Sequence, residues 1–248
     1  MRIPRIFQNQ ALHIHHTLVL DEDARRHLGT VLRLQNDARI TLFNGDGYEY
    51  PSIIKHTTAK ILTATIEDKI YKNLESPLYT HLGQVITKAN HMDYTLQKSV
   101  ELGISHITPL YATRGEVHLK GDREQKKQDH WQKIITHACQ QCGRNIRPTL
   151  EKPMSLLEWI KKTEEKTKLM LDPRATISLN HTLLDSTVAL LVGPEGGLSE
   201  TEESYAKQHG FIGVQLGPRI LRTETASLVV LSALQFLAGD LNQQESSP

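Results

Sequence analysis

The stretch Val188-Ala189-Leu190-Leu191-Val192-Gly193-Pro194-Glu195-Gly196-Gly197-Leu198 joins an unbroken apolar run to a glycine-rich loop. Such a run is typical of a strand in a parallel sheet, because helices cover both faces of that sheet. Ser199 and Glu202 follow with the spacing of a capping box, which predicts the start of a helix. A strand, a loop and a helix in this order indicate an α/β fold.

The same alternation of strands and helices extends from about residue 73 to the C-terminus. Met92, Leu96 and Val100 recur every four residues, as on one face of a helix, and Gly103 supplies a helix stop. Further helices are expected at 122–141, 154–163 and 226–237, and further strands at 81–87, 104–110, 168–171 and 213–216. This second part is therefore predicted to be a parallel sheet covered by helices.

The first 72 residues show a different rhythm, which predicts a small β-barrel. The segment Asn44-Gly45-Asp46-Gly47 separates apolar pairs and is a hairpin turn signal, and 60–67 is rich in Ile and Thr. One helix is expected at 23–32, capped by Asp21 or Asp23. Its buried face should carry Leu28, Val31 and Leu32. A polar segment ending in Ser76-Pro77 separates the two parts, so the predicted domains are 1–72 and 73–248.

Composition excludes several classes of protein. Of the 248 residues, 38% are hydrophobic and 23% charged, and no apolar run approaches the length of a membrane span. The N-terminus lacks a secretory signal pattern and there are two cysteines, so a cytoplasmic protein is expected. A net charge of +1 does not by itself mark a nucleic-acid binder, so any such contact must come from local clusters of Arg and Lys.

Three unusual loops, 171–174, 193–198 and 217–226, each follow a predicted strand of the second part. Ligands of parallel α/β sheets bind beyond the carboxyl ends of the strands, so the loops should converge on one pocket. Their glycines would let the backbone approach a ligand closely. The spacing matches neither the dinucleotide fingerprint nor a P-loop, and it suits a nucleoside recognised by backbone groups. An isolated Gly-Pro-Glu-Gly-Gly segment could also be a simple turn.

The two later loops together resemble the signature of the 16S ribosomal RNA uridine N-3-methyltransferase family of the SPOUT superfamily. The resemblance extends over nearly the whole chain. It is carried by 191–198, by Leu216-Gly217-Pro218-Arg219-Ile220-Leu221-Arg222-Thr223-Glu224-Thr225-Ala226, by Gln97-Lys98-Ser99-Val100-Glu101-Leu102-Gly103-Ile104, by Ile107-Thr108-Pro109-Leu110, by Gln140-Gln141-Cys142-Gly143-Arg144 and by Arg2-Ile3-Pro4-Arg5.

The resemblance implies more than the residues alone predict. It implies an N-terminal PUA-like β-barrel, a C-terminal SPOUT α/β domain with a trefoil knot, and a homodimer. The substrate would be 16S rRNA in the small ribosomal subunit, methylated on ring nitrogen 3 of one uridine (uracil-1498 in the family). S-adenosylmethionine would be the cofactor. The residues expected to hold it are Leu171, Asp172, Gly193, Pro194, Gly197, Leu216, Gly217, Ile220, Leu221 and Ala226.

Methylation of uridine nitrogen 3 needs a proton acceptor and donors for the negative charge that spreads onto the uracil oxygens. Arg222 is the first candidate donor and Arg144 the second, while Glu195 or Glu224 could be the base. Each has a structural alternative. Glu195 could brace its own loop, Glu224 could serve the dipole of the last helix, and Arg222 could pair with a carboxylate.

RNA contacts are expected from Arg5, Arg33, Lys88, Arg114 and Arg144. Such residues would position the RNA through its phosphates without reading its sequence. Each could equally be a solvated surface residue, as most charged side chains are.

Two motifs suggest metal binding, and three other functions are alternatives to a uridine methyltransferase. Cys139 and Cys142 lack a second cysteine pair, and the histidines at 13–16 lack a metal-binding helix context, so no metal is expected. A ribose 2'-O-methyltransferase of the same superfamily would typically carry Ser-Leu-Asn in its last motif. The other rivals are an RNA-binding assembly factor without catalysis and, more distantly, a nicotinamide oxidoreductase.

Overall fold

The computed structural model describes residues 3–58, 60–180 and 184–242. Arg2 of the N-terminal segment quoted above lies outside them. The chain divides into two compact units, the first made of 1–75 and 136–147 and the second of 76–135 and 148–248. Within the described residues, no helix is both long and apolar enough to cross a membrane.

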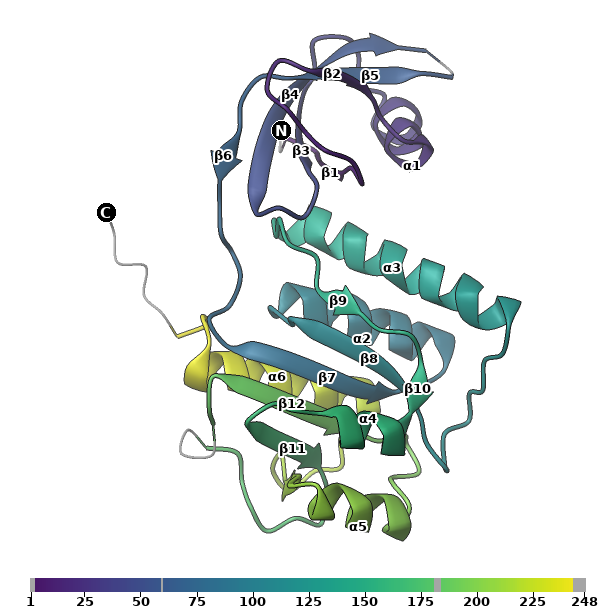
Figure 1. Ribbon diagram of the computed structural model, residues 1–248, viewed down its shortest axis with the longest axis vertical. Helices are drawn as coiled ribbons and strands as arrows, with labels where there is room; N and C mark the ends of the chain where they lie inside the picture. The colour runs from purple at the N-terminus through teal and green to yellow at the C-terminus, as the bar shows by residue number, and fades with distance from the viewer. Residues whose placement is uncertain (1–2, 59, 181–183, 243–248) are drawn as a thin grey trace. The chain divides into compact units, whose positions relative to one another are not determined.

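The first unit is built on a six-stranded sheet with the order β1-β3-β4-β5-β2, in which β6 pairs with β4 (Figure 1). Its strands are β1 (Arg5–Phe7), β2 (Thr17–Val19), β3 (Arg39–Phe43), β4 (Tyr48–Thr57), β5 (Leu62–Ile66) and β6 (Ile70–Tyr71). The predicted hairpin is confirmed, since β3 and β4 are antiparallel and Gly45 and Gly47 both have positive φ in the turn. Alternate residues such as Leu42, Ile54 and Ala64 point into one apolar core.

The predicted helix at 23–32 is only partly confirmed. Asp21 is its cap, because its Oδ1 accepts a hydrogen bond from the Ala24 amide at 2.8 Å. The segment is α-helical only over α1 (Glu22–Arg25) and continues as a π-helix, η1 (Arg26–Val31). The prediction of a buried face at Val31 and Leu32 is wrong, since these side chains are 65% and 41% exposed. The wider π-turn moves them off the 3.6-residue period on which the prediction relied.

The second unit is a parallel seven-stranded sheet with the order β10-β8-β7-β12-β11-β13, in which β9 pairs with β8. Its strands are β7 (Tyr79–Val85), β8 (His106–Tyr111), β9 (Thr149–Leu150), β10 (Met154–Ser155), β11 (Thr167–Leu171), β12 (Thr187–Val192) and β13 (Ile212–Val214). Its helices are α2 (Ala89–Glu101), α4 (Leu156–Lys162), α5 (Glu200–Gln208) and α6 (Thr223–Ala238). The helix α3 (Asp122–Cys142) begins in this unit, and its last turns belong to the first unit.

Helices cover both faces of this sheet, as predicted: α2 and α6 lie on one face and α4 and α5 on the other (Figure 1). The strand β7 shows the alternation. Gln84 faces α6, where its Oε1 accepts a hydrogen bond from Ser227 at 2.6 Å, whereas Gly83 faces Trp159 of α4. The capping box at Ser199 and Glu202 is also confirmed.

One boundary differs from the predictions in a way that matters for the site. Helix α6 begins at Thr223, so the expected loop 217–226 ends at Arg222, and the remaining residues form the first helical turn. The Ala226 amide donates to the Arg222 carbonyl at 2.8 Å and so closes that turn. Polar residues in a first helical turn have no periodic signal, which is why the sequence did not separate them from the loop.

Candidate active site

The three glycine- and proline-rich loops begin at one edge of the sheet. Strand β11 lies between β12 and β13, and all three are parallel, so Leu171, Val192 and Val214 end on the same side. Loops that follow neighbouring parallel strands are the usual ligand-binding region of such a sheet. The structure therefore brings together the segments that the sequence singled out.

The first loop is held against the end of β13. The Asp172 amide donates to the Val214 carbonyl at 3.1 Å, and the Gln215 side-chain amide donates to the Pro173 carbonyl at 3.1 Å. The Asp172 carboxylate pairs with Arg174, whose guanidinium also pairs with Glu203 of α5. The Asp172 side chain is therefore engaged within the protein.

The second loop is braced by Arg114, which the sequence had suggested as an RNA contact. Its guanidinium donates to the carbonyl oxygens of Gly196 and Leu198 at 3.2 and 3.1 Å. The Gly197 amide donates to the Pro194 carbonyl at 2.9 Å and closes a turn. Arg114 therefore positions this loop directly.

Open space lies beside two of the loop glycines. Gly197 and Gly217 have φ of +70° and +80°, and a Cβ built on either would meet no atom within 4 Å. Positive φ at both positions favours glycine, and the space leaves the adjoining backbone accessible to a ligand. Ile220, also expected at the cofactor site, has a side chain that is 87% exposed.

The two candidate bases come together around a histidine that the sequence analysis missed. His91 lies in the first turn of α2, and its Nδ1 is 3.8 Å from Glu195 Oε1 and 3.5 Å from Glu224 Oε2. The facing atoms His91 Nδ1 and Glu224 Oε2 are buried and have no hydrogen-bond partner. His91 could have been found by the rule that located the loops, because it follows β7 at the same edge of the sheet.

Arg222 is exposed and occupies the N-cap of α6 without a side-chain cap hydrogen bond. Its side chain forms no ion pair or hydrogen bond with the part of the chain that the structure describes. The alternative that Arg222 pairs with a carboxylate of its own unit is therefore not what the structure shows.

The other candidate donor, Arg144, lies in the first unit, where it is buried and pairs with Glu75. Arg5 lies in the same unit and is also engaged by groups of the protein. It pairs with Glu49 and donates to Asn145 Oδ1 at 2.6 Å and to the Gly143 carbonyl at 3.0 Å. These contacts give both arginines a structural part in the first unit, which the sequence could not indicate.

The remaining expected RNA contacts are exposed. Lys88 forms an ion pair with Glu116 at 3.3 Å, and both side chains are well solvated, so this pair contributes little to stability. Arg33 is exposed and adopts a left-handed backbone conformation, with φ of 52°.

The cysteine pair shows no sign of metal chemistry. Cys139 is buried, and burial raises the pKa of its thiol to about 12, so the reactive thiolate is not accessible at neutral pH. Among the described residues, no group of three or more His, Cys, Asp or Glu side chains is arranged so that it could hold a metal ion.

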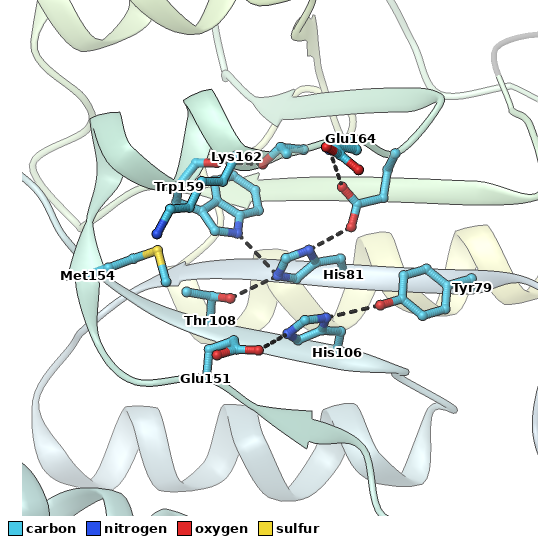
Figure 2. Close-up of a pocket in the computed structure, with 11 residues that line it drawn as sticks. Tyr79, His81, His106, Thr108, Glu151, Met154, Trp159, Lys162 and Glu164 are labelled. Carbon is cyan, nitrogen blue, oxygen red and sulfur yellow. Dashed lines mark hydrogen bonds and ion pairs between the residues drawn. The ribbon is translucent and has the colours of Figure 1, made fainter.

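A second polar cluster lines a cavity of about 380 Å³ where β7 and β8 begin, at the opposite edge of the sheet from the loops (Figure 2). The rings of His81 and His106 stack with centroids 4.0 Å apart. His81 Nδ1 lies 2.6 Å from Glu165, and its Nε2 accepts a hydrogen bond from the Trp159 indole at 3.1 Å. The indole nitrogen can only donate, so His81 Nε2 is the acceptor in this contact.

His106 should make the folded chain sensitive to acid. Burial, and then the neighbouring His81, lower the pKa of His106, although Glu151 opposes this. The unfolded chain therefore takes up this proton first, at a pH near about 6.5, and stability is lost as the pH falls below that value. We expect chemical denaturation to give a lower free energy of unfolding at pH 5.5 than at pH 7.5.

The decrease in the free energy of unfolding between pH 7.5 and 5.5 should be smaller in His106→Gln, because glutamine cannot take up a proton in this range. An equal loss in the variant would assign the acid sensitivity to other groups. Glu165 does not compete in this range. Burial alone would raise the pKa of its carboxyl, but the interaction with His81 and hydrogen bonds from the backbone together lower that pKa.

Comparison with known proteins identifies the family of both parts of the chain. Residues 74–235 match the RNA methyltransferase domain family, and residues 20–67 match the RNA methyltransferase PUA domain family. A protein of Buchnera aphidicola (from Schizaphis graminum), named ribosomal RNA small subunit methyltransferase E, is 40% identical over 97% of this chain and 99% of its own length. The equally named protein of Bacillus subtilis is 27% identical over 85% of this chain and 86% of its own length.

Two solved structures have the same fold over nearly the full length. A Legionella pneumophila protein in complex with the bound cofactor SAM superposes with a TM-score of 0.93 at 40% identity, covering 97% of this chain and 100% of that one. A ribosomal RNA small subunit methyltransferase E from Neisseria gonorrhoeae, bound to S-adenosyl methionine, gives 0.89 at 36% identity, with the same coverage.

The fold and the site thus define an RNA methyltransferase with an N-terminal PUA-like domain. Within that class, the chain belongs to the ribosomal RNA small subunit methyltransferase E family.

Proposed function

We propose that this protein transfers the methyl group of S-adenosylmethionine to ring nitrogen 3 of one uridine in 16S rRNA of the small ribosomal subunit. The observation that carries the proposal is the meeting of the glycine loops with Glu195, Glu224 and the exposed Arg222 at one edge of the parallel sheet. The names of the relatives and the methyl donor in two of their structures support it.

Two features of the loops support a nucleoside cofactor. The space beside Gly197 and Gly217 would be filled by any larger residue, and neighbouring backbone groups are left available for hydrogen bonds. We propose that the backbone around Leu171, Gly193 and Leu221 holds S-adenosylmethionine, together with the other loop positions named in the sequence analysis. Its sulfonium supplies an activated methyl group, and the protein has to align the attacking atom with it.

The nucleophile presents the harder problem, because uridine nitrogen 3 carries a proton at neutral pH. A carboxylate at Glu195 or Glu224 would accept that proton as the bond to the methyl carbon forms. Negative charge then spreads over the two uracil carbonyl oxygens. Arg222 would donate hydrogen bonds to one of them and stabilise the charge where it develops.

RNA binding would rest on exposed cations rather than on net charge. Arg33 in the first unit and Lys88 in the second are exposed, and both would contact phosphates. The target base must leave its stack to reach a site at the end of the strands, so an unpaired or flipped uridine is expected.

Analysis of the nucleosides in small-subunit rRNA tests the proposal. Subunits from cells lacking this protein should lack 3-methyluridine and should regain it when incubated with the pure protein and labelled S-adenosylmethionine. A labelled 2'-O-methyl nucleoside would instead support the ribose methyltransferase. Binding of the donor without any transfer to the RNA would favour a non-catalytic assembly factor.

We also propose that the protein is a homodimer, held in part by the exposed face of α6. Val229 and Phe236 lie seven residues apart on this helix and are 41% and 56% exposed, which forms an apolar stripe. A second copy is the proposed partner, because the resemblance to the family implies a homodimer and a two-fold contact would pair this stripe with itself.

Phe236→Asp should weaken the dimer by about 30-fold or more, since an aromatic anchor would be replaced by a charge that needs water. Sedimentation at micromolar concentration would then show a monomer. Leu157→Asp is the matched control, because Leu157 is an exposed apolar residue of α4 on the other face of the sheet. A dimer that persists in Phe236→Asp would contradict the assignment of this face.

A further inference from the structure

His91 links two segments that the sequence places far apart. Glu195 belongs to the loop after β12, whereas Glu224 lies in the first turn of α6. The imidazole of His91, in the first turn of α2, lies between their carboxylates. Three chain segments at the carboxyl edge of the sheet therefore meet at one ring nitrogen.

The charges at this point are unbalanced without a cation. The Glu224 side chain is 13% exposed, and its Oε2 is buried without a hydrogen-bond partner. A buried carboxylate oxygen in this position is costly, and a second carboxylate near it raises the cost. A proton on His91 Nδ1 would supply a positive charge to both carboxylates.

The separations are those of ion pairs rather than of closed hydrogen bonds. Distances of 3.5 and 3.8 Å from Nδ1 to the two oxygens exceed the usual hydrogen-bond range. The Thr95 hydroxyl donates to the His91 carbonyl at 2.9 Å, which holds the backbone of this turn and leaves the ring to face the carboxylates.

We propose that His91 is a positioning residue whose positively charged ring joins Glu195 to Glu224 and so holds the second loop against the start of α6. The effect of this bridge on catalysis rests on the proposed function, in which either Glu195 or Glu224, together with the adjacent Arg222, acts on the uridine. The essential property of His91 is its positive charge. It would not be the acceptor of the uridine proton.

The two possible roles of His91 predict opposite results for a lysine at this position. His91→Lys keeps a cation beside both carboxylates but provides no base while protonated, whereas His91→Gln keeps a polar side chain without charge. If His91 were the proton acceptor, both variants would lose its function. If His91 is a bridging cation, His91→Gln loses that function and His91→Lys keeps it.

Hydrogen–deuterium exchange of the ligand-free protein measures the bridge directly. In His91→Gln, the amides of 193–198 and 223–226 should exchange at least about threefold faster, because both segments lose their common partner. They should return to the wild-type rate in His91→Lys. His13→Gln, at an exposed histidine of the first unit, is the control and should change neither segment.

Methyl transfer to small subunits completes the test. We expect a loss of at least tenfold in His91→Gln and near wild-type transfer in His91→Lys. Unchanged exchange in His91→Gln would overturn the proposal. Inactive His91→Lys with normal exchange would also overturn it, in favour of a proton acceptor. If the wild type transfers no methyl group, the proposed function fails, yet the exchange result still decides whether the bridge exists.

Discussion

Arg222→Ala should lose methyl transfer to small ribosomal subunits by a factor of about 10²–10³, the range found when a donor to developing negative charge is removed. Its exposed side chain makes no hydrogen bond to cap α6, so the free energy of unfolding should stay within about 0.5 kcal/mol of the wild type. Single-turnover transfer from labelled S-adenosylmethionine measures the effect on the chemical step.

Arg219→Ala is the matched control, because Arg219 is exposed in the same loop and its removal changes the net charge equally. It should reduce transfer by no more than a few-fold, through weaker attraction of the RNA. Arg222→Lys should recover only part of the activity, since a lysine keeps the charge without the planar pair of donors. Full activity in Arg222→Ala would remove Arg222 from the mechanism.

The largest loss of stability is expected from Gly83→Ala in the middle of β7. A Cβ at this position would lie 2.6 Å from two ring atoms of Trp159. The indole cannot easily move, because it is buried, donates to His81 and packs against Phe211. Overpacking of this kind costs about 1–3 kcal/mol, and the rigid surroundings place this case at the upper end, so we expect Tm to fall by roughly 6–10 °C.

Gly213→Ala is the matched control for that substitution. Gly213 lies in β13 of the same sheet, and a Cβ there would be 3.6 Å from Ala175, an ordinary contact. Its Tm should change little. In the double variant Gly83→Ala/Trp159→Phe, the smaller ring should relieve the clash. The double variant should therefore lose less stability than the sum of the losses in the two single variants. Strictly additive losses would show that the clash is relieved elsewhere.

The elements of the second unit were largely predictable, because their signals are local. The apolar run of β12, the four-residue period of α2 and the capping box of α5 each depend on residues close in sequence. The π-helix after α1 was not predictable in this way, because its wider turn does not follow the 3.6-residue period that indicates a helix.

The candidate site was found in outline but not in its connections. Ligands of parallel α/β sheets bind beyond the carboxyl ends of the strands, and this rule predicted that the three loops lie together. The same rule applies to His91, which has no distinctive motif around it. Arg114 was predicted as an RNA contact, and its hydrogen bonds to the carbonyls of Gly196 and Leu198 give it a bracing role that charge alone did not indicate.

The sequence by itself determined the α/β character of the second unit, the β-rich first unit, the positions of the glycine loops and the family to which they point. Only the tertiary structure decided how the charged side chains are used. Arg144 pairs with Glu75, 69 residues away, and His91 meets carboxylates more than a hundred residues further along the chain. Helices and turns arise from neighbours within a few residues, whereas the partner of a charge depends on which distant segments pack beside it.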